Sequence, residues 1–126
     1  LNRFYDELKG SWTVSVVDGS VSARKRNRIF KSFQEEKAPR VILAHPGTMA
    51  HGLTLTAATT IVWAAPVTST ETFLQANARI SRPGQTKTAN IVMLHGSGVE
   101  RRLYQTLKDR RSLQDLVLKL AAEKVR

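Results

Sequence analysis

Hydrophobic positions near the start of the chain follow two different periods. The opening stretch LNRFYDELKG spaces its apolar side chains as a helix does, and Gly10 supplies a stop, so a helix is predicted over residues 1–10. The next stretch, WTVSVV, alternates and is rich in β-branched residues, which predicts a strand over 12–17 ending at Asp18-Gly19. The chain therefore switches from a helical to an extended pattern within its first twenty residues.

The same alternation continues to the end of the chain. Ser22 is placed to cap a helix over 23–36, which carries an apolar stripe made of Ile29, Phe30 and Phe33. The run RVILA, residues 40–44, is continuously apolar, as expected of a parallel strand buried on both faces. The remaining elements are predicted in this order: a polar segment over 45–56, a strand over 59–65, a helix over 68–82, a strand over 89–94 and a helix over 99–125.

Two details of the later helices can be predicted from local residue chemistry. Thr68 and Glu71 form the T-x-x-E pattern of a capping box, which is expected to open the helix over 68–82. In the last helix, Arg111-Ser112 is a candidate break. Strands that alternate with helices predict an α/β fold with a parallel sheet and right-handed crossovers. Such a domain usually begins with a strand, so the helical opening indicates a piece of something longer.

Composition and charge narrow the class of protein. The 126 residues suit one domain, and 41% hydrophobic with 24% charged residues is a globular composition. There are no cysteines, which excludes disulfides and fits an intracellular, cytoplasmic protein. No apolar run approaches the roughly 18 residues that span a bilayer, so no membrane partner is expected. The formal net charge of +10 favours a polyanionic partner, most often nucleic acid.

Candidate chemistry gathers where parallel strands are expected to end, since ligands bind at the carboxyl ends of such strands. The loop after the second strand contains glycines that let a phosphate approach the backbone, and hydroxyls that can donate to it. A purely structural turn explains these glycines equally well. The two histidines of the loop lack further metal ligands, so no metal site is predicted. The loop residues considered are His45, Gly47, Thr48, His51, Gly52 and Thr54.

The stretch QANARISRPGQ carries the strongest signal. Gln75, Arg79 and Arg82 are spaced to share one face of a helix, and Pro83-Gly84 would end that helix sharply. Guanidinium groups suit phosphate and can neutralise charge on a transferring phosphoryl group. Cations that merely complement a helix C-terminus explain the same spacing, so both readings stay open on spacing alone.

Other parts of a nucleotide hydrolase are absent from the sequence. The chain has no G-x-x-x-x-G-K-[ST] phosphate loop and no Asp-Glu pair after an apolar strand. On its own, this chain is not expected to hydrolyse a nucleotide.

The motifs together resemble those of Swi/Snf-like superfamily 2 helicases and translocases. LAHPGTMAHGLTLTAATTIVW resembles motif V, and QANARISRPGQTK resembles motif VI. Asp18-Gly19-Ser20, Arg26 and Phe33 resemble the signature before motif V, and HGSGVERRLYQTLKDRRSLQDLVLKL resembles the closing strand, turn and helices of the family. The AHP…HGLTL variant is similar to versions found in phage and prophage helicases.

The resemblance implies a fold and a place in a two-lobe motor. The fold would be a RecA-like parallel sheet with helices on both faces, missing its first strand. Residues 1–126 would form the second, C-terminal lobe, with 99–126 as a closing helical segment. The partners would be the N-terminal RecA-like lobe of the same protein and DNA, with RNA as the alternative. ATP and Mg²⁺ would be bound mainly by the first lobe, which also explains the missing phosphate loop.

The resemblance also implies roles for individual residues. Arg82 and Arg79 would be catalytic, with Arg82 as the arginine finger. The residues that would contact ATP are Gln75, Arg79, Arg82 and Gly52, and those that would contact the nucleic-acid backbone are Thr48, Gly47, Thr54, Asp18 and Gly19.

Three departures from the family pattern stand out. WAAPVTS lacks the acidic residue and the Asn that often follow motif V, Thr54 replaces a common Asn, and Ser81 replaces a common His. Two other hypotheses therefore remain beside the motor lobe. One is a non-catalytic basic module that binds nucleic acid, and the other is an α/β domain whose motif VI arginines serve a protein interface.

Overall fold

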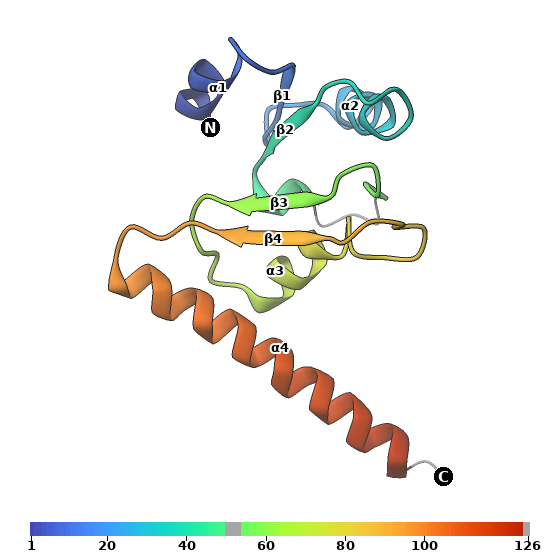
Figure 1. The fold of residues 1–126 in the computed structure, drawn as a ribbon, viewed down its shortest axis with the longest axis vertical. Helices are drawn as coiled ribbons and strands as arrows, with labels where there is room; N and C mark the ends of the chain where they lie inside the picture. Colours follow the sequence, from blue (N-terminus) through green and yellow to red (C-terminus); the bar gives the residue numbers. More distant parts are fainter. Residues whose placement is uncertain (50–53, 125–126) are drawn as a thin grey trace.

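Helices and strands alternate along the chain in the predicted order (Figure 1). The computed structural model describes the backbone of residues 1–49 and 54–124 and, within the last helix, the side chains up to 110 and from 120 to 122. The elements are α1 (Asn2–Leu8), β1 (Val14–Val17), α2 (Ala23–Glu36), β2 (Val41–Ala44), the 3-10 helix η1 (Pro46–Met49), β3 (Thr60–Trp63), α3 (Thr70–Asn77), β4 (Asn90–Met93) and α4 (Gly98–Lys124).

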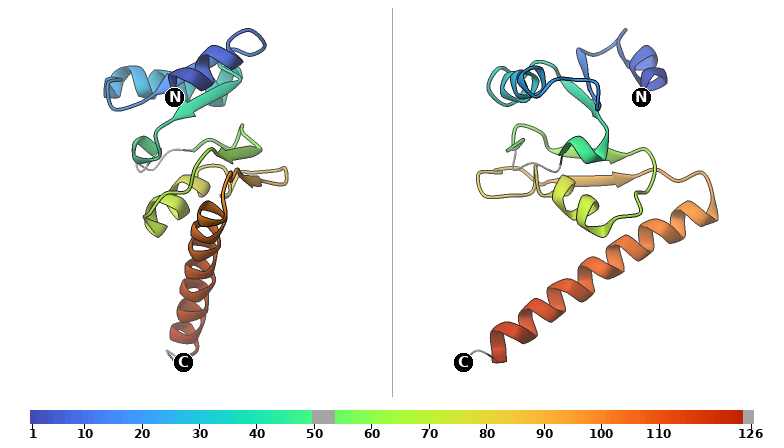
Figure 2. Two further views of the ribbon diagram at one scale, coloured as in Figure 1. Left: turned by 90° about the vertical axis from the view of Figure 1, so that its left-hand side faces the viewer. Right: turned by 180° about the vertical axis from the view of Figure 1, so that it is seen from behind.

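The four strands form two parallel pairs. β1 pairs with β2 and β3 pairs with β4, with Val17 opposite Ala44 and Trp63 opposite Met93 at the carboxyl ends. In the described part of the chain these pairs are two separate two-stranded sheets, β1–β2 and β3–β4, which both views of Figure 2 show lying one above the other. The α/β fold with parallel strands is therefore confirmed, with its strands divided between two short sheets.

One buried cluster joins the two pairs. Val17 of β1 and Phe30 of α2 pack with Leu55 and Ile80, and each of these side chains is at most 4% exposed. The predicted apolar stripe of α2 thus contributes Phe30 to the interior. Ser22 caps the same helix as predicted, because its hydroxyl oxygen accepts the amide of Lys25 at 3.2 Å. Leu55 and Ile80 come from the two segments that carry the candidate chemistry, so this cluster also positions the site.

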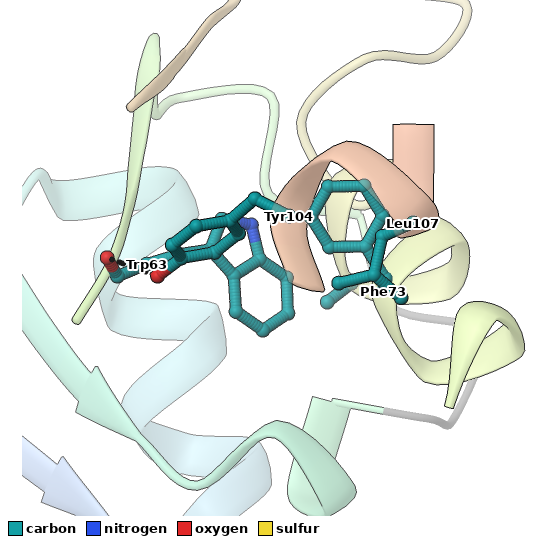
Figure 3. Close-up of a cluster of buried hydrophobic side chains, with 5 residues drawn as sticks. Trp63, Phe73, Tyr104 and Leu107 are labelled. Carbon is teal, nitrogen blue, oxygen red and sulfur yellow. Dashed lines mark hydrogen bonds between the residues drawn. The ribbon is translucent and has the colours of Figure 1, made fainter. Parts of the chain in front are cut away.

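A second buried cluster attaches α3 and α4 to the β3–β4 pair (Figure 3). The indole of Trp63 lies 5.1 Å from the ring of Phe73, centroid to centroid, and donates its N–H to Asn77 Oδ1 at 2.9 Å. Tyr104 donates its hydroxyl to the Trp63 carbonyl at 3.2 Å, and burial raises the pKa of that hydroxyl, with a smaller contribution from the Glu100 carboxylate. Trp63 therefore contacts both helices at once.

Three sequence predictions about α3 and α4 are wrong. The N-cap of α3 is Ser69 rather than Thr68, since the Ser69 hydroxyl accepts the Thr72 amide at 3.2 Å. α3 ends at Asn77 and does not continue to residue 82. α4 runs without a break through 111–112. Its second half extends away from both sheets (Figures 1 and 2).

No helix in the described residues is long and apolar enough to cross a membrane.

The packing predicts that truncating two leucines of α4 lowers the free energy of unfolding by unequal amounts. Leu107 is 3% exposed in the Trp63 cluster, whereas Leu103 is 42% exposed on the same helix. We expect Leu107→Ala to lower the free energy of unfolding by about 2 to 5 kcal/mol, because it leaves a cavity. Leu103→Ala should change it by less than about 0.5 kcal/mol. Urea unfolding followed by tryptophan fluorescence measures both, and equal losses for the two variants would refute this packing.

Candidate nucleotide and nucleic-acid interface

The turn after β1 is organised by the side chain of Asp18. Its Oδ1 accepts the amide of Ser20 at 2.9 Å and also accepts the Ser20 hydroxyl. These bonds, the one from the hydroxyl first, lower the pKa of Asp18 from its ordinary value, so the carboxylate is negative at neutral pH. A negative carboxylate repels phosphate. Of the two residues predicted here to contact nucleic acid, Asp18 therefore shapes the turn, and only the exposed backbone of Gly19 is suited to a phosphate.

Among the predicted phosphate contacts in the loop after β2, one residue is buried and two are exposed. Thr48 in η1 is only 8% exposed, and its hydroxyl donates to the carbonyl of His45 at 2.7 Å. Because a hydroxyl has one proton to donate, Thr48 secures the loop and offers no donor to a phosphate from this position. Gly47 and Thr54 are exposed as the predicted contacts require. Gly52, predicted to contact ATP, lies outside the described residues.

The segment after α3 is a series of turns, which corrects the prediction of one helical face. The amides of Arg79 and Ile80 bond back to the carbonyls of Ala76 and Asn77, three residues earlier. Arg79 and Arg82 therefore lie beyond the helix, and only Gln75 lies on it. The charge of Arg82 still reaches the Arg79 guanidinium, because after burial it is the second cause that lowers the pKa of Arg79.

Pro83 and Gly84 form the middle of a tight turn that presents Arg82. The Gln85 amide bonds to the Arg82 carbonyl at 3.1 Å, and Gly84 has a φ of 101°. Proline followed by a residue with positive φ is the arrangement of a type II β-turn, which favours glycine at that position. The predicted sharp turn is confirmed, and it follows a run of turns rather than a helix.

Arg79 bonds to the loop that follows β2 at two points, Met49 and Leu55. Its Nε donates to the Met49 carbonyl at 2.9 Å, and its own carbonyl accepts the Leu55 amide at 2.9 Å. The side chain is 9% exposed. Burial, and then the neighbouring charge of Arg82, lower the pKa of Arg79 from its ordinary value. Arg79, predicted to bind phosphate, is thus also the structural link between the loop after β2 and the turns that follow α3.

Two glutamines that the sequence did not single out as site residues fix the segment just after this loop. Gln34 of α2 donates to the Thr56 hydroxyl at 2.8 Å and accepts the Ala57 amide at 2.9 Å. Gln85 donates to the Ala58 carbonyl at 2.8 Å. Both side chains have partners more than twenty residues away in sequence, so no local pattern could reveal them. Gln85 was visible only as one letter within QANARISRPGQTK, the stretch that resembles motif VI.

Gln75 faces a shallow depression on α3. It is half-buried and donates to Glu71 at 3.0 Å, and both residues line the depression with Thr70 and Leu74. A second depression, of about 430 Å³, opens between the carboxyl end of β2 and the start of α3. It is lined by His45, Pro46, Gly47, Pro66, Val67, Thr68, Ser69 and Thr72. The exposed Gly47 therefore lies in a concave surface, whereas Gln75 lies in a different one.

The charged groups of the site fit a phosphate better than a metal. Among the side chains that the structure describes, no three His, Asp or Glu residues are grouped so that they could hold a metal ion. The two guanidiniums of Arg79 and Arg82 are close enough for their repulsion to lower the pKa of Arg79. An anionic phosphate beside them would relieve that repulsion. The donor set here suits the phosphate part of a nucleotide.

Taken with the parallel α/β fold, these features place the chain among helicase C-terminal domains. The family described as helicase conserved C-terminal domain matches residues 1–84, and the chain belongs to it. No curated protein sequence matches the chain.

Solved structures of helicase lobes share this fold. The C-terminal part of the Fun30 ATPase domain superimposes with a TM-score of 0.70 at 23% identity, covering 82% of this chain and 33% of that one. The C-terminal domain of the DEAD-box protein Dbp5 gives 0.71 at 19% identity, covering 86% and 62%. A variant of S. cerevisiae Dbp5 bound to RNA and ADP BeF3 gives 0.68 at 19% identity, covering 86% and 28%. This chain spans less than two thirds of each of these structures.

The turn that presents Arg82 predicts that replacing Gly84 by alanine lowers the stability of the protein. Its φ is positive and nothing lies within 4 Å of an added Cβ, so Gly84→Ala would strain the backbone without a steric clash. We expect a loss of about 1 to 2 kcal/mol in the free energy of unfolding. Gly10→Ala is the matched control, since that site is equally open and lacks a positive φ. Thermal unfolding compares them, and a Gly84→Ala protein as stable as Gly10→Ala would contradict the turn assignment.

Proposed function

We propose that this chain is the second motor lobe of an ATP-dependent DNA helicase or translocase. The observation that carries the proposal is the double attachment of Arg79 to the loop after β2, with Arg82 on the adjoining turn. This attachment joins a candidate phosphate site to a candidate nucleic-acid loop. Membership of the helicase C-terminal domain family supports it. We treat residues 1–126 as one lobe, with 99–126 as its closing helical segment.

Arg82 is the proposed arginine finger. It lies on a tight turn past the end of α3, half-buried and next to a second guanidinium. From such a position it can neutralise negative charge that develops on a phosphoryl group held by the opposite lobe. Arg79 adds its charge to the same site and orients the loop after β2. Gln75 and Gly52 complete the set proposed to contact ATP.

ATP, bound with Mg²⁺ mainly by the first lobe, supplies the phosphoanhydride bond whose hydrolysis drives the motor. The residues of this chain orient the phosphates and exclude water when the lobes close. Because this chain supplies only one side of that cleft, we expect it to be inactive by itself and to bind ATP weakly. The N-terminal RecA-like lobe of the same protein is the proposed partner.

The nucleic-acid contacts are proposed for the exposed backbone at the carboxyl ends of β1 and β2. Gly19, Gly47 and Thr54 are all exposed there, with Thr48 and Asp18 shaping the two loops from within. Contacts of this kind grip the sugar–phosphate backbone without reading sequence. DNA is the proposed substrate because the motifs resemble Swi/Snf-like proteins. RNA is the alternative, since a Dbp5 structure with the same fold is bound to RNA.

The finger assignment predicts a loss of hydrolysis without a loss of binding. In the full-length protein, Arg82→Ala should reduce DNA-stimulated ATP hydrolysis by about 10³-fold, because the charge in the transition state is no longer neutralised. Affinity for DNA should change by less than about twofold, since this side chain is proposed to face the nucleotide.

Lys87→Ala is the matched control, because Lys87 is an exposed cation five residues further on. It should leave hydrolysis unchanged. Steady-state ATPase assays and fluorescence anisotropy measure the two effects. The proposal fails if Arg82→Ala retains wild-type hydrolysis, or if the wild-type full-length protein shows no stimulation by any nucleic acid.

A further inference from the structure

A line of cations runs along the outer face of α2. Arg24, Arg28 and Lys31 are spaced i, i+4 and i+7, which places them within one narrow stripe of the helix. All three are exposed. The buried Phe30 and half-buried Phe33 point to the opposite side of the helix. We call Arg24, Arg28 and Lys31 the α2 stripe. It belongs to none of the contacts proposed above.

The distribution of charge along α2 is unfavourable for the stability of the helix. Its first turn contains no acidic residue and its last turn no basic one, although helix ends favour the reverse. Arg24 and Arg28 are like charges four residues apart, and Lys31 follows three residues later, so the stripe repels itself. No acidic residue occurs between 19 and 34. A helix that keeps such a pattern is expected to have a use for it, because unfavourable local choices concentrate at functional sites.

Among the described residues, no ion pair links the stripe to an acidic side chain, although the exposed Glu35 follows Lys31 by four residues on the same face of α2. The two ion pairs found among the described residues, Arg3–Glu7 and Lys9–Asp6, both lie at or just beyond α1. Gln34 fixes the buried side of α2 to the loop segment at Thr56. The backbone of the helix is therefore held in place while its cations face solvent, so binding an anion has to order their side chains but not the helix.

The position of the stripe continues the proposed nucleic-acid surface. α2 begins four residues after the exposed Gly19, directly beyond the Asp18 turn. It lies beside the β1–β2 pair, and the β3–β4 pair lies between it and α4 in every view (Figures 1 and 2). Seven residues of helix rise about 10 Å, and successive phosphates of one strand advance about 3.4 Å along a duplex axis. Three cations over that length therefore match about three phosphates.

We propose that the α2 stripe is a second contact to the phosphate backbone of a nucleic-acid strand, outside the ATP cleft and independent of sequence. It rests on the proposed function only in taking the substrate to be nucleic acid. Its role is to raise the affinity of the protein for nucleic acid and to hold the strand that passes the Gly19 turn. The alternative occupant of such a surface, an acidic protein segment, is an outcome that the test below distinguishes.

The test neutralises the stripe in the full-length protein with Arg24→Gln, Arg28→Gln and Lys31→Gln together. Glutamine is a good helix former and removes like-charge repulsion, so folding should be retained, which circular dichroism checks. The charge-matched control changes three exposed arginines of α4 to glutamine: Arg101, Arg102 and Arg110. Both variants lose three positive charges, so they differ only in where the charge was removed.

Binding is measured by fluorescence anisotropy on labelled duplex DNA, single-stranded DNA and RNA over a range of salt concentrations. We expect the α2 variant to weaken binding at least tenfold at low salt on one of the three. The slope of log affinity against log salt should fall by about 2 to 3, as expected for two or three lost phosphate contacts. The control should change affinity by less than threefold. The nucleic acid with the largest loss is the one that the stripe binds.

ATP hydrolysis separates this inference from the proposed function. At saturating nucleic acid the α2 variant should hydrolyse ATP as fast as the wild type, with only the half-stimulating concentration raised. Equal losses for the α2 and α4 variants would overturn the inference, since net charge alone would explain them. Unchanged affinity for all three nucleic acids would also overturn the inference. Polyglutamate serves as the probe for an acidic protein segment, and a loss of polyglutamate binding alone would assign the stripe to such a segment. A wild type that binds nucleic acid without hydrolysing ATP would overturn the proposed function alone.

Discussion

The hydrogen bonds of Arg79 are the constraint on which the site depends. One buried arginine donates from Nε to the carbonyl of Met49 and accepts the amide of Leu55 with its own carbonyl. These two contacts hold two points of the loop between β2 and β3 against the turns that follow α3. Without them, the candidate phosphate site and the candidate nucleic-acid loop would be two unconnected features at one edge of the fold.

The surrounding packing makes this link rigid. Leu55 and Ile80, which flank the Arg79 contacts, are both buried with Val17 and Phe30 in the cluster that joins the two strand pairs. Gln34 and Gln85 fix the next residues of the loop from α2 and from the Arg82 turn. A displacement of Arg82 would therefore reach the loop after β2 through Arg79 and the buried Ile80 and Leu55. In a motor, such a path would let the state of the nucleotide alter the grip on the strand.

Much of this architecture could be predicted from residue patterns, because the relevant signals are local. The β-branched runs predicted four strands, and the cap at Ser22 predicted the start of α2. The shared face of Gln75, Arg79 and Arg82 was wrong for a physical reason. Spacing assumes that a helix continues, whereas bonds of the 3-10 type close the chain into turns after Asn77. The burial of Arg79 could not be predicted either, since its partner Met49 is thirty residues away and arginine is usually exposed.

We propose that Arg79 couples the nucleotide to the nucleic-acid loop. The most direct measurement is the affinity of the full-length protein for DNA with and without a non-hydrolysable ATP analogue, in the wild type and in Arg79→Gln. We expect the analogue to change the affinity of the wild type by about fivefold or more, and this ratio to fall toward one in Arg79→Gln. An Arg79→Gln protein that binds the analogue and keeps the full wild-type ratio would contradict this proposal.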